Sequence, residues 1–220
     1  ITQAATSLLP GTLASKNVAM VLLPDAKAED ADAIAAQLKN AGATVTGRVS
    51  LTSTWVDLSR ENYRSTFSGQ VQGHLGSTNS KDANGILGEA LAKALTANDD
   101  SSRVLMDMLS VTVDKSGTPF ISVDSTPTAA AEMIVVVGPR PQASSGKGAT
   151  VEASPGEDPK AWAKALTGTA SRATTVVVGS ADGDDNVVTV IRSESAKVST
   201  VDSVGQVAAS VSAPLALAST

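Results

Sequence analysis

Three unbroken apolar runs, each ending at a glycine or a proline, constrain the fold of this chain more than any other feature. A strand with one face in water alternates apolar and polar residues, so a continuous run indicates burial on both faces. Buried strands separated by helical stretches predict an α/β domain of three layers with a mostly parallel sheet. The runs are Val18–Leu23 before Pro24, Met133–Val137 before Gly138, and Thr175–Val178 before Gly179.

The segments between these runs supply further helices and strands. Thr44–Leu51 alternates apolar and polar residues and predicts a strand with a wetter face. Val187–Ile191 is β-branched and predicts a strand, with a short helix as the alternative. The remaining expectations are a helix from the acidic residues Asp25–Asp30 to Gly42, a helix over Asp57–Phe67, a loop over Gly69–Ser80, helices over Asp82–Leu95 and Ser101–Leu109, a short strand Phe120–Val123, a helix starting at Asp158, a last strand Lys197–Val201 and a final helix capped by Asp202.

Composition excludes several classes of function. The net charge of −5 and the lack of a Lys/Arg cluster argue against nucleic acid as a ligand, because phosphate binding needs a basic face. With no cysteine, the chain has no disulfide, no cysteine-bound zinc or iron–sulfur cluster and no thiol nucleophile. No stretch approaches the roughly 18 continuous apolar residues of a membrane helix.

In α/β domains, functional groups usually follow the buried strands, and the motifs at these places are incomplete. The loop Gly138–Thr150 contains Gly-Lys, but Pro141 stands where a phosphate-binding loop needs glycine, and Gly148 where it needs Ser or Thr. Asp182, Asp184 and Asn186 alternate as in a calcium loop, yet Val187 replaces the turn glycine and Ser193 the bidentate glutamate. Gly179-Ser180-Ala181-Asp182-Gly183 lacks one residue of a nucleophile elbow.

The remaining chemistry would have to use a single histidine and two neighbouring methionines. His74 stands in a Gly-rich loop, where a solvent-facing role is favoured over catalysis. Met106 and Met108 carry thioethers that suit Cu(I), and on a strand they could share an ion. On a helix they would point about 200° apart, which favours packing in the core instead. We therefore expect no catalytic residues, no bound cofactor and no assembled metal site, with copper as the one candidate ion.

The N-terminal residues form a separate unit in this interpretation. Ile1, Ala5 and Leu8 recur at heptad-like spacing, Leu9 widens the stripe, and Pro10 ends it. Residues 1–15 are interpreted as the end of a coiled-coil helix with its linker, and residues 16–220 as the α/β domain. We expect Ile1, Ala5, Leu8 and Leu9 to form a partner interface in a homodimer. The alternative is a frayed terminal helix packed on its own domain.

Several of these segments, taken in order, resemble a known family. They are Lys16–Pro24 with the acidic helix after it, Ala41–Gly47, Trp55–Tyr63, Met133–Gly138, Thr175–Gly179 and Val198–Asp202. In this order they resemble the actinobacterial copper transporter MctB family over nearly the whole chain. The resemblance implies an N-terminal membrane helix, a coiled coil and an extracytoplasmic α/β domain. It also implies copper efflux across the outer membrane or, for SteB-like members, a role in cell separation.

The residues favour one of these implied roles over the other. A domain of buried parallel strands with polar helix faces cannot line a pore by itself, because backbone polar groups find no partners in lipid. The chain has four methionines, one histidine and no cysteine, so no cluster of soft copper ligands is visible. We expect a non-catalytic envelope domain that acts through protein contacts as a scaffold or regulator. A component of copper efflux or homeostasis is the alternative.

Overall fold

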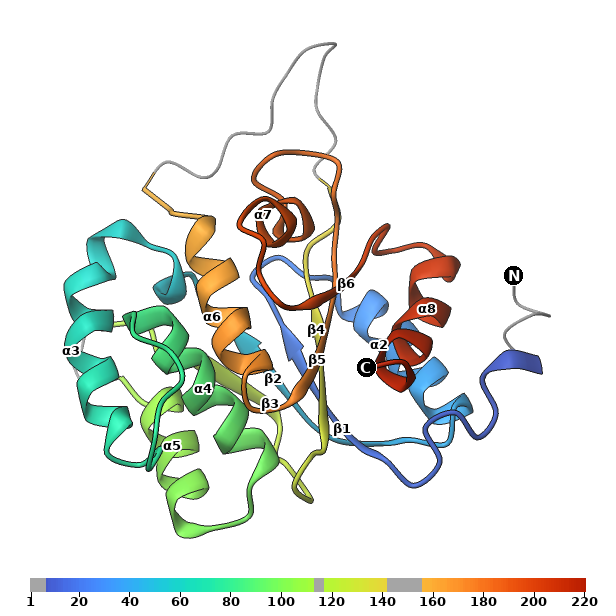
Figure 1. Ribbon diagram of the computed structural model, residues 1–220, viewed down its shortest axis with the longest axis horizontal. Coiled ribbons are helices and arrows are strands. Elements are labelled where there is room, and N and C mark those ends of the chain that lie inside the picture. Colours follow the sequence, from blue (N-terminus) through green and yellow to red (C-terminus); the bar gives the residue numbers. More distant parts are fainter. Residues whose placement is uncertain (1–6, 113–116, 142–155) are drawn as a thin grey trace.

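The computed structural model describes residues 7–112, 117–141 and 156–220. These residues form one mixed sheet covered by helices on both faces (Figure 1). The predicted three-layer α/β fold is confirmed. Within the described ranges, no helix is long and apolar enough to cross a membrane.

Six strands make up the sheet, in the order β3-β2-β1-β4-β5-β6. All neighbours are parallel except β3, which runs antiparallel to β2 at one edge. The direction of winding reverses between β1 and β4, since β1 leads outward to β2 and β4 leads the other way to β5. The strands are β1 (Asn17–Leu22), β2 (Thr44–Leu51), β3 (Ile121–Ser125), β4 (Met133–Val137), β5 (Thr174–Val178) and β6 (Ser199–Val201).

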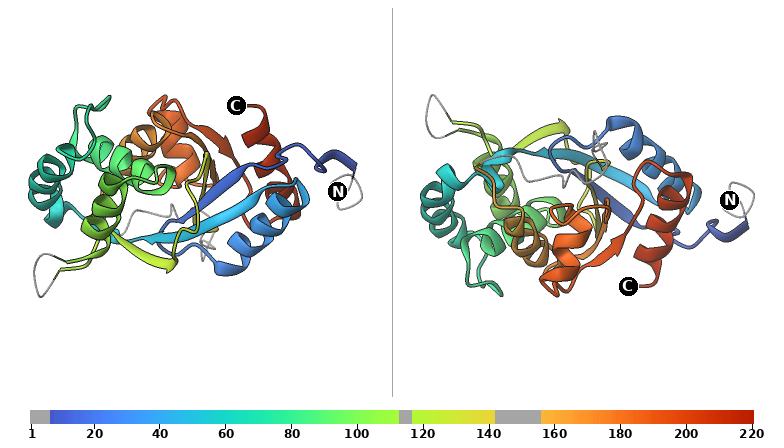
Figure 2. Two further views of the ribbon diagram at one scale, coloured as in Figure 1. Left: turned by 90° about the horizontal axis from the view of Figure 1, so that it is seen from below. Right: turned by 90° about the horizontal axis from the view of Figure 1, so that it is seen from above.

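The helices divide unequally between the two faces of the sheet. α2 (Ala28–Asn40) and α8 (Val207–Ala218) cover one face, and the other helices cover the opposite face (Figures 1 and 2). Those on the opposite face are α3 (Glu61–Gln72), α4 (Ala83–Thr96), α5 (Asp100–Ser110), α6 (Lys160–Ala170) and α7 (Val187–Ser193), with the short 3-10 helices η1 (Ser53–Trp55) and η2 (Leu58–Arg60) before α3.

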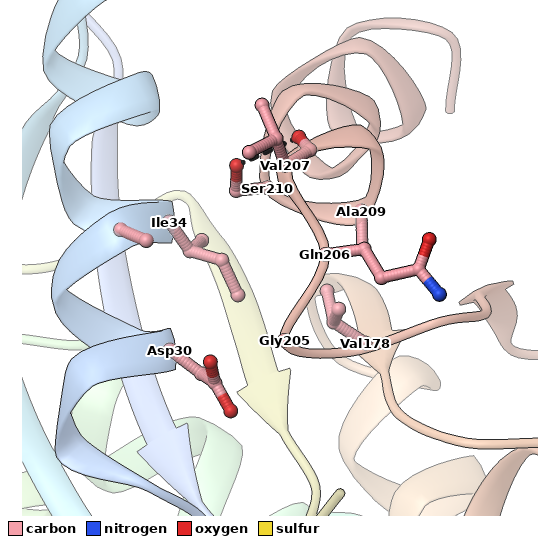
Figure 3. Close-up of a pocket in the computed structure, with 9 residues that line it drawn as sticks. Asp30, Ile34, Val178, Gly205, Gln206, Val207, Ala209 and Ser210 are labelled. Atoms are coloured by element: carbon pink, nitrogen blue, oxygen red, sulfur yellow. Dashed lines mark hydrogen bonds between the residues drawn. The ribbon is translucent and has the colours of Figure 1, made fainter.

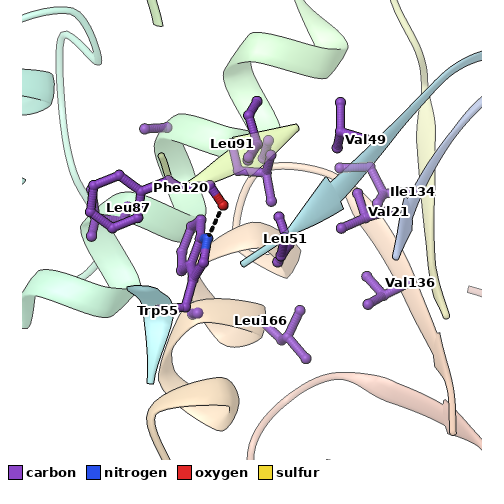
Figure 4. Close-up of a cluster of buried hydrophobic side chains, with 14 of the residues drawn as sticks. Val21, Val49, Leu51, Trp55, Leu87, Leu91, Phe120, Ile134, Val136 and Leu166 are labelled. Atoms are coloured by element: carbon purple, nitrogen blue, oxygen red, sulfur yellow. Dashed lines mark hydrogen bonds between the residues drawn. The ribbon is translucent and has the colours of Figure 1, made fainter. Parts of the chain in front are cut away.

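The five aromatic side chains of the chain gather in one cluster on the crowded face. Trp55 and Phe120 meet edge to face with ring centroids 5.5 Å apart, and the Trp55 indole Nε1 donates to the Phe120 carbonyl over 2.9 Å (Figure 4). Trp162 stacks on Trp55 at 6.3 Å, while Tyr63 and Phe67 stack on Phe120. The large side chains thus fill the space under α3, α4 and α6, where small aliphatic residues alone would leave voids.

Glycines allow α4 and α6 to pack backbone against backbone. A Cβ on Gly88 would collide with the carbonyl oxygen of Ala165, and one on Gly168 would collide with that of Gly85. The sequence predicted a helix over Asp82–Leu95 but not this contact, because the two helices lie far apart along the chain. The close approach leaves Leu87, Leu91 and other apolar residues of α4 fully buried.

Three sequence expectations need correction. The loop was predicted to begin at Gly69, but α3 continues through Gly69 and ends at Gln72. Val187–Ile191 is helical, since its apolar residues pack onto the ends of β4 and β5 and outweigh β-branched propensity. Asp202 does not cap α8, which begins at Val207. Its Oδ1 instead accepts from the backbone N–H groups of Ala181 and Ser203, which ties the segment after β5 to the end of β6.

Candidate functional site

The carboxyl ends of β1 and β4 form the place where folds of this kind usually bind ligands. In open α/β sheets, a crevice opens where the strand order reverses, and loops from both strands line it. Here β1 is followed by Pro24 and Asp25, and β4 is followed by Gly138, Pro139 and Arg140. We call this place the switch-point crevice.

Arg140 fills one side of the switch-point crevice through ion pairs with the start of α2. Its Nε and Nη2 donate to Asp30 Oδ2 and Oδ1 over 2.8 and 2.7 Å, and Nη2 lies 2.6 Å from Glu29 Oε1. The hydrogen bonds to Asp30 and its negative charge raise the pKa of Arg140. Both carboxylates stand in the first turn of α2, where they complement the helix dipole. The N-terminus that could receive a phosphate group is therefore already occupied by anionic side chains.

Gly205 explains how Arg140 also reaches the turn before α8. The residue has a φ of +87°, and a Cβ built on it would lie 2.5 Å from Arg140 Nε. The backbone conformation therefore favours glycine, and a side chain at this position would displace the Arg140 guanidinium. Arg140 connects the end of β4, the start of α2 and the β6–α8 turn. The sequence did not reveal this contact, because 110 positions separate Arg140 from Asp30.

A small pocket lies beside this contact, between α2 and α8 (Figure 3). Its volume is about 100 Å³, and its wall is mainly apolar. Asp30 is the charged residue of the wall and is 5% exposed, with both oxygens already bonded to Arg140. The lining residues are Asp30, Ala33, Ile34, Val178, Gly205, Gln206, Val207, Ala209 and Ser210.

α7 covers the neighbouring strand ends on the opposite face. Cβ atoms built on Gly138 and Gly179 would lie 2.9 and 2.6 Å from Val187 Cγ1. Val188 is fully buried and Val187 is 5% exposed, so apolar side chains fill the space above β4 and β5. The ends of these strands are therefore covered by the chain itself.

Carboxylates surround the crevice where it borders β2 and α6. Burial raises the pKa of Glu157, and the negative charges of Asp25 and Asp57 raise it further. Hydrogen bonds from the Ser59 hydroxyl and backbone N–H lower the pKa of Asp57. The positive charges of Arg60 and Arg64 also act on Asp57, so this part of the crevice edge carries charges of both signs.

The structure places the incomplete motifs in roles of local packing. Ser180 is 1% exposed, and its Oγ accepts from the Asp182 backbone N–H, so it is no exposed nucleophile. Among the described residues, no group of three or more His, Asp or Glu side chains is arranged to hold a metal ion. The part of the Gly138–Thr150 loop that contains Lys147 lies outside the described residues.

The soft-metal candidates do not meet. Met106 and Met108 could share an ion only if they were on a strand, but both lie on the helix α5. Both are partly buried against the larger core cluster. His74 follows α3, and its carbonyl oxygen accepts a 2.7 Å hydrogen bond from Lys93 Nζ.

One fully buried carboxylate escaped the sequence analysis. Glu89 on α4 is 0% exposed, and its Oε1 accepts from the backbone N–H groups of Asn79 and Ser80 over 2.8 and 2.6 Å. Its Oε2 accepts from Arg172 Nε over 2.8 Å. Since both oxygens are engaged, Glu89 anchors the loop before α4.

The expected partner residues at the N-terminus have different environments. Leu9 is fully buried with Leu13 in the smaller core cluster under α2 and α8, whereas Leu8 is 57% exposed. Ile1, Ala5 and the other residues from 1 to 6 lie outside the described residues. The partner interface and the domain boundary at residue 16 stay predictions.

The family resemblance is supported by an independent comparison. No curated protein matches this chain. The model of a family described as copper transport outer membrane protein, MctB, matches residues 1–220. The match extends over the α/β fold and the crevice described above, and the chain belongs to the MctB family.

Proposed function

We propose that this chain, a member of a copper-transport family, is a non-catalytic domain of the cell envelope. It acts through contacts with other proteins, as a scaffold or regulator. The observation that carries the proposal is the filling of the switch-point crevice by the chain's own residues. Arg140 with Asp30 and Glu29 occupies one side, and Val187 and Val188 of α7 cover the other. Because the usual ligand position is filled, binding of other proteins at the surface is favoured over binding of a small ligand in the crevice.

The proposed contacts include self-association through the N-terminal helix. Leu8 is the described member of the heptad-like stripe that is open to solvent, while Leu9 and Leu13 anchor the segment on the domain. A helix extending from this anchor would hold two domains side by side. Scaffolding of envelope assembly or cell separation, as in SteB-like members, follows from such a dimer that presents two α/β surfaces.

Light scattering on the full-length protein, as its gene encodes it, tests the dimer. L8D should lower the measured mass from dimer to monomer, because a charge would enter the interface. L58D is a matched control, since Leu58 is 52% exposed on η2, away from the N-terminus. A monomer in the unaltered protein, or equal masses for both variants, contradicts the proposal.

A partner in the envelope is the second part of the proposal. Cross-linking of the full-length protein in envelope extracts should yield a defined protein partner. The same partner should be recovered with variants whose substitutions lie in the core. Recovery of nothing but copies of this chain would reduce the proposal to self-association. The measurement separates a scaffold from a protein that acts alone.

A direct role in copper handling is the alternative, and the family description favours it. Calorimetry with Cu(I) under anaerobic conditions distinguishes the two. A surface-acting domain should give no tight binding, whereas tight binding abolished by M106A or H74A would support the alternative. M133A serves as the control for general loss of thioether, because Met133 is in β4 at the opposite end of the strand from the crevice.

A further inference from the structure

α7 is helical against its own local preferences. Five β-branched residues follow one another in this helix of seven residues, from Val187 to Ile191. β-branched side chains lose rotamer freedom in a helix, and a helix this short is unstable in isolation. Asn186 stands at the N-cap position without making a side-chain capping bond. The helical form of α7 therefore depends on its packing against the rest of the domain.

One polar group in α7 is left unsatisfied. Among the described residues, Thr189 Oγ1 is the buried side-chain oxygen that has no hydrogen-bond partner. A helical threonine usually donates to the carbonyl of an earlier turn, but Thr189 lies in the first turn of α7. An unpaired buried hydroxyl raises the free energy of the packed state, because it would bond to water if exposed.

The Val188 backbone N–H donates to the Ser180 carbonyl over 3.3 Å, but the side-chain polar contacts that hold α7 to its neighbours are exposed. Lys160 Nζ and Glu194 Oε1 form a 3.2 Å ion pair between side chains that are 68% and 38% exposed. Arg192 Nε donates to Thr200 Oγ1 over 3.2 Å, also at the surface. Such contacts contribute little, because water and salt compete with them. α7 is retained mainly by the apolar packing of Val187, Val188 and Ile191.

We propose that α7 is a displaceable plug of the switch-point region. Its opening exposes the carboxyl ends of β4 and β5 beside the crevice, while the sheet and the other helices stay folded. In the closed state, Val187 lies against Gly138 and Gly179 and excludes ligands from this edge. The inference goes beyond the proposed function, because it concerns regulated access to an edge that is covered in the closed state.

Hydrogen exchange on the full chain tests the plug directly. Amides of α7 should exchange at least about tenfold faster than those of α6, although both helices pack on the same face. The α7 rates should depend weakly on denaturant, because a local opening exposes little surface. Exchange of α7 at the rate of α6, with the same denaturant dependence, would overturn the proposal.

Thiol labelling gives a second measurement. The chain contains no cysteine, so an introduced cysteine is the only thiol that reacts. Val188 in α7 and Val177 in β5 are both 0% exposed. Under native conditions, the thiol of V188C should be labelled at least about tenfold faster than that of V177C. Equal rates would mean that both sites open only when the whole domain unfolds, and the plug would be rejected.

Two further variants should close the plug. T189A removes the unpaired hydroxyl and raises helix propensity, so α7 exchange should slow. T169A is the matched control, because the Thr169 hydroxyl is satisfied by the Gly88 and Ala165 carbonyls and its loss should not slow α7. A disulfide in G179C/V187C should bring α7 exchange down to the global rate. Unchanged α7 exchange in both the T189A and the disulfide-linked proteins would contradict the mechanism.

Discussion

The α4–α6 pair and α7 both depend on glycines for close packing, but the contacts differ in kind. Gly88 and Gly168 meet backbone carbonyl oxygens of the opposite helix, which cannot move without the whole helix. Gly138 and Gly179 meet methyl groups of Val187 and Val188, which can shift when α7 shifts. The first arrangement gives a rigid block, and the second gives a cover that can lift. What touches a glycine therefore decides whether the contact is rigid or yielding.

The largest effect is expected at the rigid contact. G88A and G168A should each lower the free energy of unfolding by about 3 kcal/mol or more, since the methyl group forces the helices apart and opens the core. Urea denaturation measures the loss. G69A is the control, because its Cβ would meet nothing within 4 Å and alanine favours a helix. A mild effect of G88A would show that the α4–α6 contact is not rigid.

The buried anchor of the same block comes next. E89Q should destabilise the domain by about 3 kcal/mol, because Arg172 would lose its ionic partner. E132Q should cost much less than E89Q, since the Glu132–Lys16 pair is largely exposed. Chemical denaturation of both proteins compares them. Equal losses would mean that burial of the ion pair has no bearing on the stability of the block.

A smaller effect is expected on the yielding side. G179A places a Cβ 2.6 Å from Val187 Cγ1, and the side chain or α7 must move to admit it. We expect a loss of about 1 kcal/mol in global stability and faster hydrogen exchange confined to α7. If G179A destabilised the protein as much as G88A, the distinction between the two contacts would fail.

The smallest effect is expected from charge at the start of α6. Burial and the charges of Asp25 and Asp57 raise the pKa of Glu157 in the folded state. At pH above this raised pKa, the ionised Glu157 lowers the stability of the folded state relative to the unfolded state. This loss of stability disappears as the pH falls toward the ordinary pKa of 4.5. At pH 8, E157Q should raise the free energy of unfolding by less than about 1 kcal/mol. The gain should appear as a slightly higher melting temperature. A gain that persists at pH 4 would contradict this origin.

Much of the sheet is predictable because its signal is local. The runs in β1, β4 and β5 consist of residues that must be buried on both faces, and the structure confirms all three strands. The helix expected from Asp82 is also confirmed, since Asp82 caps α4 and its Oδ1 accepts from the Gly85 backbone N–H. In each case, the pattern and its physical cause lie within a few neighbouring residues.

The candidate site was predictable only in part. The strand pattern points to the ends of the buried strands, but only the strand order places the crevice between β1 and β4. The partners of Arg140 do not follow from the pattern either. Asp30 and Gly205 reach it from α2 and the β6–α8 turn, and neither carries a local signal for that contact. Asp202 also satisfied the pattern of a helix cap, yet it bonds to Ala181 across the sheet edge.

The sequence by itself determined the α/β class, the buried strands and the membership of a known family. These depend on composition and on short periodic patterns, which report burial without knowledge of the partners. Only the tertiary structure decided that Val187–Ile191 is a helix and that Arg140 pairs with Asp30 at one side of the crevice. The physical reason is that packing against residues distant in the chain outweighs local propensity, and no local pattern encodes those contacts.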